Sequence, residues 1–414
     1  MKIVAMNESV NQINYCEVCG NKNLVSVLDL GLHPMCDDLV EVSDSRECKD
    51  YPIEILYCKI CRTAHQKYQV PKHELFPMSY HYRARFTADV LEGMKGLVNS
   101  CESQFGTLDD KLVLDIGCND GSLLGFFREK GAKTLGIEPT GACEDAVKNG
   151  HEAICDYLSV ELANKVVTKY GNPDIITFTN VFAHIEDLKG VLDSLKILKK
   201  NDTKIVIENH YLGAVLDGNQ FDTFYHEHPR TYSYTSFKYM ALTLGLHIES
   251  VEFPSRYGGN IRVFIGNSLD FKTSVNMEEL EIKEDSFFER FNTLEKNIQT
   301  WLKVKTDELK AHFEKYGKIR AKAFPGRAAI LVKMLNLDSD TISKVYEKPG
   351  SLKIGHFLPG TRIPIHSDDE LISSDDQTSP ILNLAWHISK EIESYLRKNH
   401  YNGEIIHVLS KDDF

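Results

Sequence analysis

The stretch Leu112-Val113-Leu114-Asp115-Ile116-Gly117-Cys118-Asn119-Asp120-Gly121-Ser122 decides the fold of this chain. An apolar run meets an acidic residue, a Gly-x-x-x-Gly turn follows, and residues 122–131 then read as a helix. Glycines let the backbone approach a ligand closely. Open α/β sheets bind their ligands at the C-terminal edge of parallel strands. The stretch therefore predicts a strand, a ligand-binding loop and a helix in that order.

The same alternation continues on both sides of this stretch. A helical apolar pattern over residues 86–98 precedes it, with spacings of three and four. Strand-like and helix-like runs then alternate at 133–139 and 143–150, at 174–180 and 188–199, and at 204–209. A helix at 233–245 and two β-like pieces at 246–254 and 258–267 close the region. Such alternation predicts an α/β domain with a parallel sheet covered on both faces.

The composition of this loop limits the classes of ligand that it can bind. A dinucleotide fold uses GxGxxG, whereas Gly117 and Gly121 are spaced GxxxG, and the Lys-Ser/Thr of a triphosphate loop is absent. Glu138, at the tip of the next strand, can accept both hydroxyls of a ribose. Asp156 follows the third strand and can flank an adenine, and Asn180 opens the NVFAH stretch that faces the same crevice. A glycine turn in another α/β enzyme is the alternative, but Glu138 favours a cofactor site.

The length and the net charge of the chain limit the functions that it can have. A chain of 414 residues predicts two or three domains. A net charge of -12 disfavours nucleic acid and anionic membrane surfaces as partners, so we expect a small-molecule substrate. The N-terminus lacks the apolar core of a signal peptide, and no apolar run is long enough to span a bilayer. We therefore expect a cytoplasmic protein; its oligomeric state is left open, and a monomer is compatible with the sequence.

Four of the ten cysteines form a metal-binding pattern. Cys16 and Cys19 make one CxxC turn, and Cys58 and Cys61 make another. Two such pairs complete a tetrahedral zinc site with no open position, which predicts a structural Zn²⁺. The alternative is two unrelated pairs of free or redox-active thiols. We interpret Cys36, Cys48 and His65 as ordinary residues rather than ligands.

Residues Tyr225-His226-Glu227-His228 concentrate proton-handling side chains. No third metal ligand is evident, and in a loop the group suits acid–base chemistry because histidine accepts protons near neutral pH. Buried, hydrogen-bonded loop residues would give the same composition, and composition alone does not separate the two readings.

Family resemblance adds to this reading. LDIGCNDGS followed by GIEP resembles the first two motifs of class I methyltransferases. That resemblance implies that Asp115, Gly117, Asn119, Gly121 and Glu138 hold S-adenosylmethionine. FDTFYHEHPRTYSYTSF resembles the signature of the zinc-containing sugar C-methyltransferases. Further landmarks are LGLHPMCDDL (30–39), YHYR (80–83), YGGNIR (257–262) and LPGTRIPI (358–365).

The resemblance implies three domains. These are a zinc-binding domain (1–77), a Rossmann-like methyltransferase domain (78–270) and a smaller C-terminal α/β substrate-binding domain (271–414). It also implies a nucleotide-linked 4-keto sugar as substrate. His228 would then be the base that removes the proton next to the ketone, with Tyr225 and Glu227 contacting the sugar or the enolate oxygen. Tyr80 or Tyr82 would close the pocket.

Two departures from the family pattern keep alternatives open. The C-terminal domain usually carries a GYGAxAKG-like loop, whereas residues 323–329 read AFPGRAA. Arg327 either binds a phosphate of the substrate or is a surface arginine. The region after Tyr82 also lacks the expected serine-rich run. Methylation of oxygen or nitrogen on a sugar or another phosphorylated metabolite is the alternative function.

Overall fold

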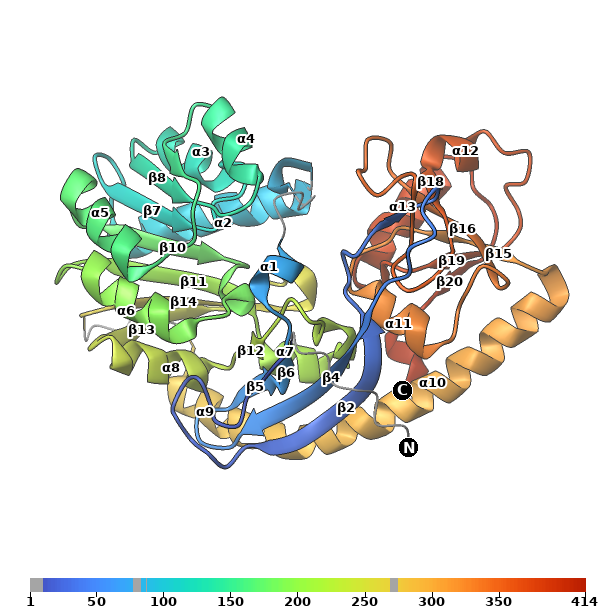
Figure 1. The fold of residues 1–414 in the computed structure, drawn as a ribbon, viewed down its shortest axis with the longest axis horizontal. Coiled ribbons are helices and arrows are strands. Elements are labelled where there is room, and N and C mark those ends of the chain that lie inside the picture. The colour runs from blue at the N-terminus through green and yellow to red at the C-terminus, as the bar shows by residue number, and fades with distance from the viewer. Residues whose placement is uncertain (1–9, 77–82, 87, 269–274) are drawn as a thin grey trace. The chain divides into compact units, whose positions relative to one another are not determined.

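The computed structural model describes residues 10–76, 83–86, 88–268 and 275–414, which form two compact units (Figure 1). Unit 1 comprises Met1–Ser26, Leu56–Val215 and His228–Phe288, and unit 2 comprises Val27–Ile55, Leu216–Glu227 and Glu289–Phe414. Two strands pass from one unit to the other, β2 (Val25–Pro34) and β4 (Asp50–Cys58). Each unit is described by itself below.

Unit 1 is built on a seven-stranded sheet with the order β13-β14-β11-β10-β7-β8-β9. The five strands from β11 to the edge strand β9 are parallel, and β14 is antiparallel to both of its neighbours. The strands are β7 (Leu112–Ile116), β8 (Lys133–Ile137), β9 (Ala153–Ile154), β10 (Ile175–Thr179), β11 (Lys204–His210), β13 (His247–Glu252) and β14 (Asn260–Gly266). The chain order reverses between β7 and β10, which is the switch point where such sheets bind ligands.

Helices cover this sheet as the alternating pattern predicts. The helices are α2 (Ala88–Phe105), α3 (Ser122–Glu129), α4 (Ala142–Lys148), α5 (Val160–Tyr170), α6 (Leu188–Leu198) and α8 (Tyr234–Thr243). Leu97 and Val98 of α2 and Leu123 and Phe127 of α3 pack on Val113 in one buried core. The predicted helix over 86–98 is therefore present, although α2 continues to Phe105.

The N-terminal part of unit 1 is joined to the sheet region by strand pairing. β5 (Thr63–Gln66) pairs antiparallel with β12 (Arg230–Thr231), so that Arg230 lies opposite His65. β1 (Asn11–Gln12) pairs with β6 (Tyr68–Gln69). The cysteine-rich segment thus shares a sheet with the residues that directly follow the Tyr225–His228 motif.

Unit 2 contains a second, smaller α/β layer, which confirms the expected C-terminal fold. Its parallel five-stranded sheet has the order β18-β16-β15-β19-β20. The strands are β15 (Ile319–Lys322), β16 (Ile342–Glu347), β18 (Ile365–Ser367), β19 (Ile381–Asn383) and β20 (Ile405–His407). The associated helices are α11 (Ala328–Met334), α12 (Asp368–Ile372) and α13 (Ser389–Lys398).

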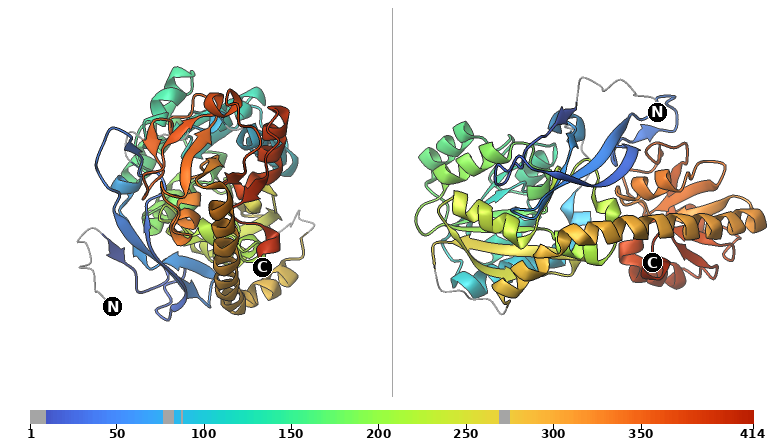
Figure 2. Two further views of the ribbon diagram at one scale, coloured as in Figure 1. Left: turned by 90° about the vertical axis from the view of Figure 1, so that its right-hand side faces the viewer. Right: turned by 90° about the horizontal axis from the view of Figure 1, so that it is seen from below.

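A long charged helix, α10 (Phe287–Tyr316), is uninterrupted in Figure 2. In unit 2, Trp301 of this helix is fully buried and its indole N–H donates to the Val408 carbonyl at 2.9 Å. A shorter helix, α9 (Met277–Asp285), precedes α10. Among the described residues, no helix has both the length and the apolar character needed to cross a membrane.

One pair of cysteines forms a bond that the sequence analysis did not predict. Cys143 of α4 is disulfide-bonded to Cys155, which follows β9. Cys143 lies in α4 and Cys155 comes 12 residues later, after β9, and the parallel pairing of β8 with β9 brings these two positions together.

Glu284 of α9 holds the start of α8 through its buried carboxylate. It accepts hydrogen bonds from the Tyr234 N–H (2.7 Å), the Thr235 N–H (2.9 Å) and the Thr235 hydroxyl (2.6 Å). The Tyr211 hydroxyl adds a bond of 3.1 Å. Free N–H groups at a helix start need such acceptors because no intrahelical partner exists for them.

We predict that Glu284→Ala lowers the free energy of unfolding by about 2–3 kcal/mol, because buried donors lose their acceptor. Urea unfolding followed by circular dichroism measures this change. The matched control is Glu281→Ala on the same helix, whose side chain is 38 % exposed and pairs with Lys238; it should change stability by less than about 0.5 kcal/mol. Equal losses in the two variants would contradict the prediction.

Candidate active site and metal centre

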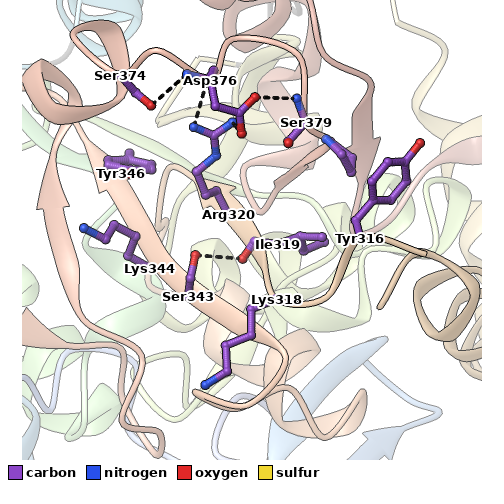
Figure 3. A pocket seen from close by; sticks show the side chains of 11 residues that line it. Tyr316, Lys318, Ile319, Arg320, Ser343, Lys344, Tyr346, Ser374, Asp376 and Ser379 are labelled. Atoms are coloured by element: carbon purple, nitrogen blue, oxygen red, sulfur yellow. Dashed lines mark hydrogen bonds and ion pairs between the residues drawn. The ribbon is translucent and has the colours of Figure 1, made fainter. Parts of the chain in front are cut away.

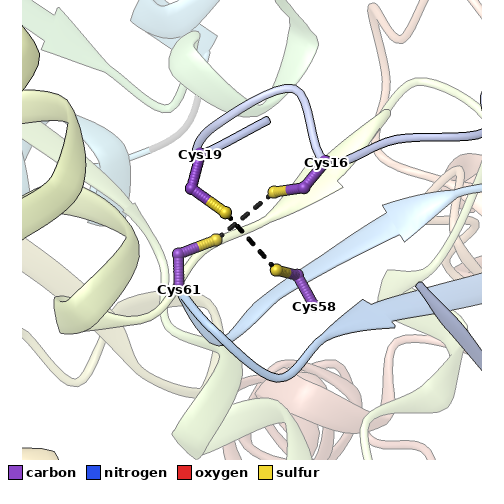
Figure 4. A group of neighbouring side chains, drawn as sticks. All are labelled: Cys16, Cys19, Cys58 and Cys61. Atoms are coloured by element: carbon purple, nitrogen blue, oxygen red, sulfur yellow. Dashed lines mark hydrogen bonds between the residues drawn. The ribbon is translucent and has the colours of Figure 1, made fainter. Parts of the chain in front are cut away.

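The four predicted metal ligands come together in unit 1. The Sγ atoms of Cys16, Cys19, Cys58 and Cys61 all lie within 4.8 Å of one another (Figure 4). Cys16 and Cys61 are 3.3 Å apart, and Cys19 and Cys58 are 3.6 Å apart. Four thiolates at about 2.3 Å from one Zn²⁺ have sulfur–sulfur edges of roughly 3.8 Å. The arrangement therefore fits a tetrahedral zinc ion with no open position for a substrate.

Neighbouring polar groups orient these sulfurs. The Cys61 Sγ lies 3.0 Å from the Thr63 hydroxyl, and the Cys16 Sγ lies 3.3 Å from the His65 Nε2. The Cys61 carbonyl accepts hydrogen bonds from the Ser233 and Ser236 hydroxyls at the start of α8. His65 thus lies beside the sulfur cluster without being a fifth ligand of it, and the centre is anchored to the sheet region of unit 1.

The loop between β7 and α3 requires its glycines. Gly117 and Gly121 have φ values of 75° and 82°. A Cβ at Gly117 would lie 2.4 Å from the Val181 side chain, and a Cβ at Gly121 would lie 2.4 Å from His151. Asn119 also has a positive φ, 51°, which asparagine tolerates better than most residues. The loop therefore exposes backbone rather than side chains at the switch point.

Glu138 is brought against this loop. One carboxylate oxygen accepts the Asn119 N–H at 3.1 Å, and the other accepts the Thr140 N–H at 2.9 Å and its hydroxyl at 2.6 Å. Asp156 is exposed one strand further on, and its carboxylate accepts the Tyr157 N–H at 2.7 Å. The predicted ribose and adenine residues thus follow β8 and β9, at the same edge as the glycine loop.

Asp115 lies beneath the loop rather than on its surface. Its side chain is buried in the sheet and accepts the Thr177 hydroxyl at 2.6 Å. Burial raises the pKa of this carboxyl to about 7. Asp115 therefore supports the loop from the sheet, and direct contact with a cofactor stays a prediction.

Asn180 is held by a buried network that the sequence analysis did not identify. Its side-chain oxygen accepts the Asn260 amide at 3.1 Å, and the same amide donates to Glu208 at 3.1 Å. Glu208 is fully buried and forms ion pairs with Arg262 at 2.7 Å and Arg256 at 3.3 Å. Asn260 and Arg262 belong to the YGGNIR landmark, so this motif supports the cofactor edge of the sheet.

Three histidines cluster at the carboxyl ends of β10 and β11. The His228 ring lies 4.8 Å from the His184 ring and 5.2 Å from the His210 ring, measured between centroids. His184 belongs to the NVFAH stretch, and His210 ends β11. The predicted base thus lies at the same edge of the sheet as the cofactor loop. His210 carries no motif, and its position became evident only from the structure.

The other members of the Tyr225–His228 motif belong to unit 2, where His226 and Glu227 are buried and Tyr225 is partly buried. Burial, and then the negative charge of Asp37, raise the pKa of the Glu227 carboxyl to about 8. Burial also raises the pKa of the Tyr225 hydroxyl well above its ordinary value. His226 has a structural role, because its Nε2 is 3.1 Å from the Tyr51 carbonyl and burial lowers its pKa to about 4.

Arg327 is not the surface arginine that one of the two alternatives from the sequence expected. It is not a surface residue, since its side chain is only 9 % exposed, and it forms an ion pair with the fully buried Asp222. Its Nε donates to one carboxylate oxygen at 2.8 Å and its Nη2 to the other at 2.6 Å. Tyr80 and Tyr82 lie outside the described residues.

A separate cavity of about 280 Å³ lies in unit 2, where β15 and β16 begin (Figure 3). Arg320 on its wall is bonded to Asp376, and Lys344 is paired with Glu370. Parallel sheets bind ligands at the opposite, carboxyl edge of their strands. The cavity contains none of the predicted site residues, and we assign no chemistry to it.

Comparison with known families agrees with this geometry. Residues 16–76 match the family model of a zinc binding domain, residues 94–251 that of a methyltransferase domain, and residues 255–409 that of a C-methyltransferase C-terminal domain. Together with the sheet order and the glycine loop, these matches define an S-adenosylmethionine-dependent methyltransferase.

Similarity to a curated protein narrows the class. The chain is 26 % identical over 401 residues to the C-methyltransferase NovU of Streptomyces niveus, which covers 94 % of this chain and 93 % of the relative. In its succession of a zinc-binding, a methyltransferase and a C-methyltransferase C-terminal domain, the chain is similar to this relative over nearly its whole length.

Two solved structures are similar to part of this chain. Magnesium protoporphyrin IX methyltransferase of Synechocystis PCC 6803 is 14 % identical and covers 43 % of this chain and 83 % of its own, with a TM-score of 0.34. PH0226 of Pyrococcus horikoshii OT3 is 14 % identical and covers 47 % and 98 %, with a TM-score of 0.36.

We predict that the purified protein contains about one zinc ion per chain and that Cys19→Ser loses it, because three thiolates no longer close the tetrahedron. Metal analysis and thermal unfolding measure both effects, since a structural metal contributes directly to folding. Cys48→Ser is the matched control, because its half-buried thiol donates to the Asp38 carbonyl and is not part of the four-cysteine cluster. Undiminished zinc in Cys19→Ser would contradict the assignment.

We also predict a pH-dependent effect of Glu227→Gln on stability. A glutamate in an unfolded chain has a pKa of about 4.3. In the folded protein, burial raises the pKa of Glu227 to about 8. The folded protein therefore keeps this proton up to a higher pH than the unfolded chain does. As the pH rises from about 4.3 to about 8, the native protein loses stability.

The stability gained by Glu227→Gln over the native protein should therefore grow from pH 5 to about pH 8. Urea unfolding at several pH values measures this difference. Glu47→Gln, an exposed residue of the same unit, is the control and should show no such trend. A gain that is constant with pH would show that Glu227 is ionised in the fold.

Proposed function

We propose that this enzyme transfers the methyl group of S-adenosylmethionine to a carbon atom next to the ketone of a nucleotide-linked 4-keto sugar. One observation carries the proposal. His228 lies at the carboxyl edge of β10 and β11, beside His184 and His210, and the glycine loop of residues 117–121 ends the neighbouring strand β7 at that edge. A proton acceptor and a methyl-donor site thus share one edge of the sheet. The match to a C-methyltransferase C-terminal domain supports carbon as the acceptor atom.

The chemistry needs a base because a carbon atom is not nucleophilic while it carries its proton. A neighbouring ketone acidifies that proton, and a neutral imidazole with an ordinary pKa of about 6.5 can accept it. His228 takes the proton on a ring nitrogen, and the C–H electron pair passes into the enolate. Bound S-adenosylmethionine supplies a methyl group on a positively charged sulfur. The enolate carbon forms the new C–C bond as the carbon–sulfur bond breaks.

The residues before His228 in the chain suit the oxygen of the enolate. Because burial raises the pKa values of Glu227 and Tyr225, both side chains keep their protons at neutral pH. A protonated carboxyl and a phenol each offer one O–H donor, and a donor aimed at developing negative charge stabilises the transition state. Closure of the pocket by Tyr80 or Tyr82 is part of the same proposal.

The cofactor loop has a separate task. Its backbone at Gly117, Asn119 and Gly121 would hold the methionine part of S-adenosylmethionine, and Glu138 would exchange its present loop donors for the ribose hydroxyls. Asp156 would lie beside the adenine and Asn180 below the crevice. Catalysis then depends on holding the methyl group and the enolate carbon in line, since orientation accounts for much of the barrier in such transfers.

The test uses S-adenosylmethionine, a panel of nucleotide-linked sugars with and without a 4-keto group, and deuterated water. We expect methyl gain at carbon on a keto-sugar, together with exchange of the proton next to the ketone. His228→Asn should lower both by about 100-fold or more, because the base is lost. Mass spectrometry and carbon NMR of the product measure the outcome.

His356→Asn, in unit 2 and outside the predicted site, is the control. Methyl gain at oxygen or nitrogen on a sugar without a ketone would reject carbon methylation in favour of the alternative function. Retention of proton exchange in His228→Asn would reject His228 as the base. S-adenosylhomocysteine binding, measured by calorimetry in both variants, shows whether a loss arises from the cofactor site instead.

A further inference from the structure

The carboxyl edge of the unit 2 sheet is a second potential ligand position. The strand order is β18-β16-β15-β19-β20, so the strands after β15 are added first on one side of it and then, from β19 onward, on the other side. The switch point therefore lies between β15 and β19. Open parallel sheets bind ligands in the crevice at this position. Residues 323–327 follow β15, and residues 384–388 follow β19, so these two loops decide what the crevice holds.

In this protein the crevice holds a side chain of the protein itself. Asp222 is fully buried, and its carboxylate accepts two hydrogen bonds from Arg327 at 2.8 and 2.6 Å. A third comes from the Trp386 indole N–H at 2.8 Å. Arg327 follows β15 and Trp386 follows β19, so both loops of the switch point bind one carboxylate. The Arg327 guanidinium also lies 5.2 Å from the centre of the Trp386 ring.

The β15 loop is itself fixed in place. Ala323 has a φ of 60°, and the Phe324 side chain is 1 % exposed. The Phe324 N–H donates to Glu347 at 2.6 Å, and its carbonyl accepts from Lys353 at 2.7 Å. The loop is thus a rigid element that presents Arg327 in one orientation.

Asp222 belongs to the segment that carries Tyr225 and Glu227. It lies in a short 3-10 helix, Phe221–Thr223. The Phe221 ring packs on Trp301 with centroids 5.0 Å apart, and the Phe224 ring packs on Phe291 at 6.0 Å. Between these two hydrophobic contacts, Asp222 adds polar contacts to Arg327 and Trp386 that hold the segment. Tyr225 and Glu227 follow a few residues later.

The same loop also meets the other neighbour of Glu227. A Cβ added at Gly326 would lie 3.2 Å from the Cys36 Cβ and 3.5 Å from a carboxylate oxygen of Asp37. The Cys36 backbone N–H and the charge of Asp37 both act on the pKa of Glu227. Residues 326 and 327 therefore contact both the segment before Glu227 and the residues that face it.

We infer that residues 325–327 are a positioning element for Tyr225 and Glu227, with Arg327 as the positioning residue acting through Asp222, and that this switch point does not bind the substrate's phosphates. The inference rests on the proposed role of Tyr225 and Glu227. A guanidinium whose charge is balanced by a bidentate carboxylate has little attraction left for a phosphate. The two hydrogen bonds from the planar Arg327 guanidinium fix both the distance and the angle of the Asp222 carboxylate. A lysine ammonium at position 327 would not fix both.

The experiment compares Arg327→Gln, Arg327→Lys, Asp222→Asn and the double variant Arg327→Gln/Asp222→Asn. The matched control is Lys322→Met, which breaks another buried ion pair of the same sheet. Lys322 bonds Asp368 at 2.8 and 2.9 Å, and the two side chains are 1 % and 0 % exposed. This control separates general weakening of unit 2 from an effect on the 220–227 segment.

Two readouts are measured for each variant. The first is kcat and KM for the keto-sugar that the wild-type enzyme methylates, together with S-adenosylhomocysteine affinity. The second is backbone hydrogen–deuterium exchange of peptides covering residues 216–228, which needs no substrate. Thermal unfolding checks that each variant is folded.

We expect Arg327→Gln and Asp222→Asn each to lower kcat by about 100-fold, the size of effect that a displacement of about 1 Å can have. KM and cofactor affinity should stay within about threefold, and the double variant should be no worse than either single variant because both remove one contact. Arg327→Lys should recover only part of kcat. Exchange in residues 220–227 should accelerate in the Arg327 variants and not in Lys322→Met.

Other results would overturn the inference. A rise in KM specific to diphosphate-linked sugars, with kcat and 220–227 exchange unchanged in Arg327→Gln, would assign Arg327 to phosphate binding. Equal effects in Lys322→Met would reduce Arg327 to a stability role. If the wild type methylates no sugar in the panel, the proposed function fails. The hydrogen–deuterium exchange measurement then decides alone, and unchanged exchange of residues 220–227 in Arg327→Gln rejects the inference.

Discussion

The proposed site depends on contacts at both ends of residues 220–231, each made within the unit to which that end of the segment belongs. In unit 2, Asp222 is bound by Arg327 and Trp386, and in unit 1, Arg230 and Thr231 pair with β5 beside the cysteine cluster. Tyr225, Glu227 and His228 lie between these anchors. Within unit 2 the C-terminal sheet, which contains no proposed reacting group, holds residues 220–227 through Asp222, and within unit 1 the strand β5 holds Arg230 and Thr231.

Burial is the second physical theme of the site. In water, Glu227 and Asp115 would be ionised at neutral pH, but desolvation raises their pKa values to about 8 and about 7. Removal of water thus converts Glu227 from a charge into a potential hydrogen-bond donor. The same desolvation makes the Arg327–Asp222 pair sensitive to loss of one partner, because a lone buried charge has no solvent to replace it.

The predicted elements of unit 1 were largely correct because their signals are local. The Gly117–Gly121 spacing, the acidic Glu138 one strand later and the paired CxxC turns each need only neighbours in the chain to be recognised. His184 and His210 were not assigned roles, since a histidine at a strand end has no local signature. Arg327 was misjudged for a similar reason. Its partner lies 105 residues away, and nothing near it in sequence shows whether its charge is free or balanced.

By itself, the sequence determined the class I methyltransferase fold, the glycine loop after β7 and the cluster of four cysteines, because glycine conformation, hydrophobic period and thiol spacing depend on adjacent residues. Only the tertiary structure decided that Glu227 is buried, that three histidines cluster, that Cys143 meets Cys155, and that Asp222 fills the C-terminal switch point. These contacts join residues far apart in the chain, and the packing of strands and loops chooses among many pairings that the sequence alone leaves equivalent.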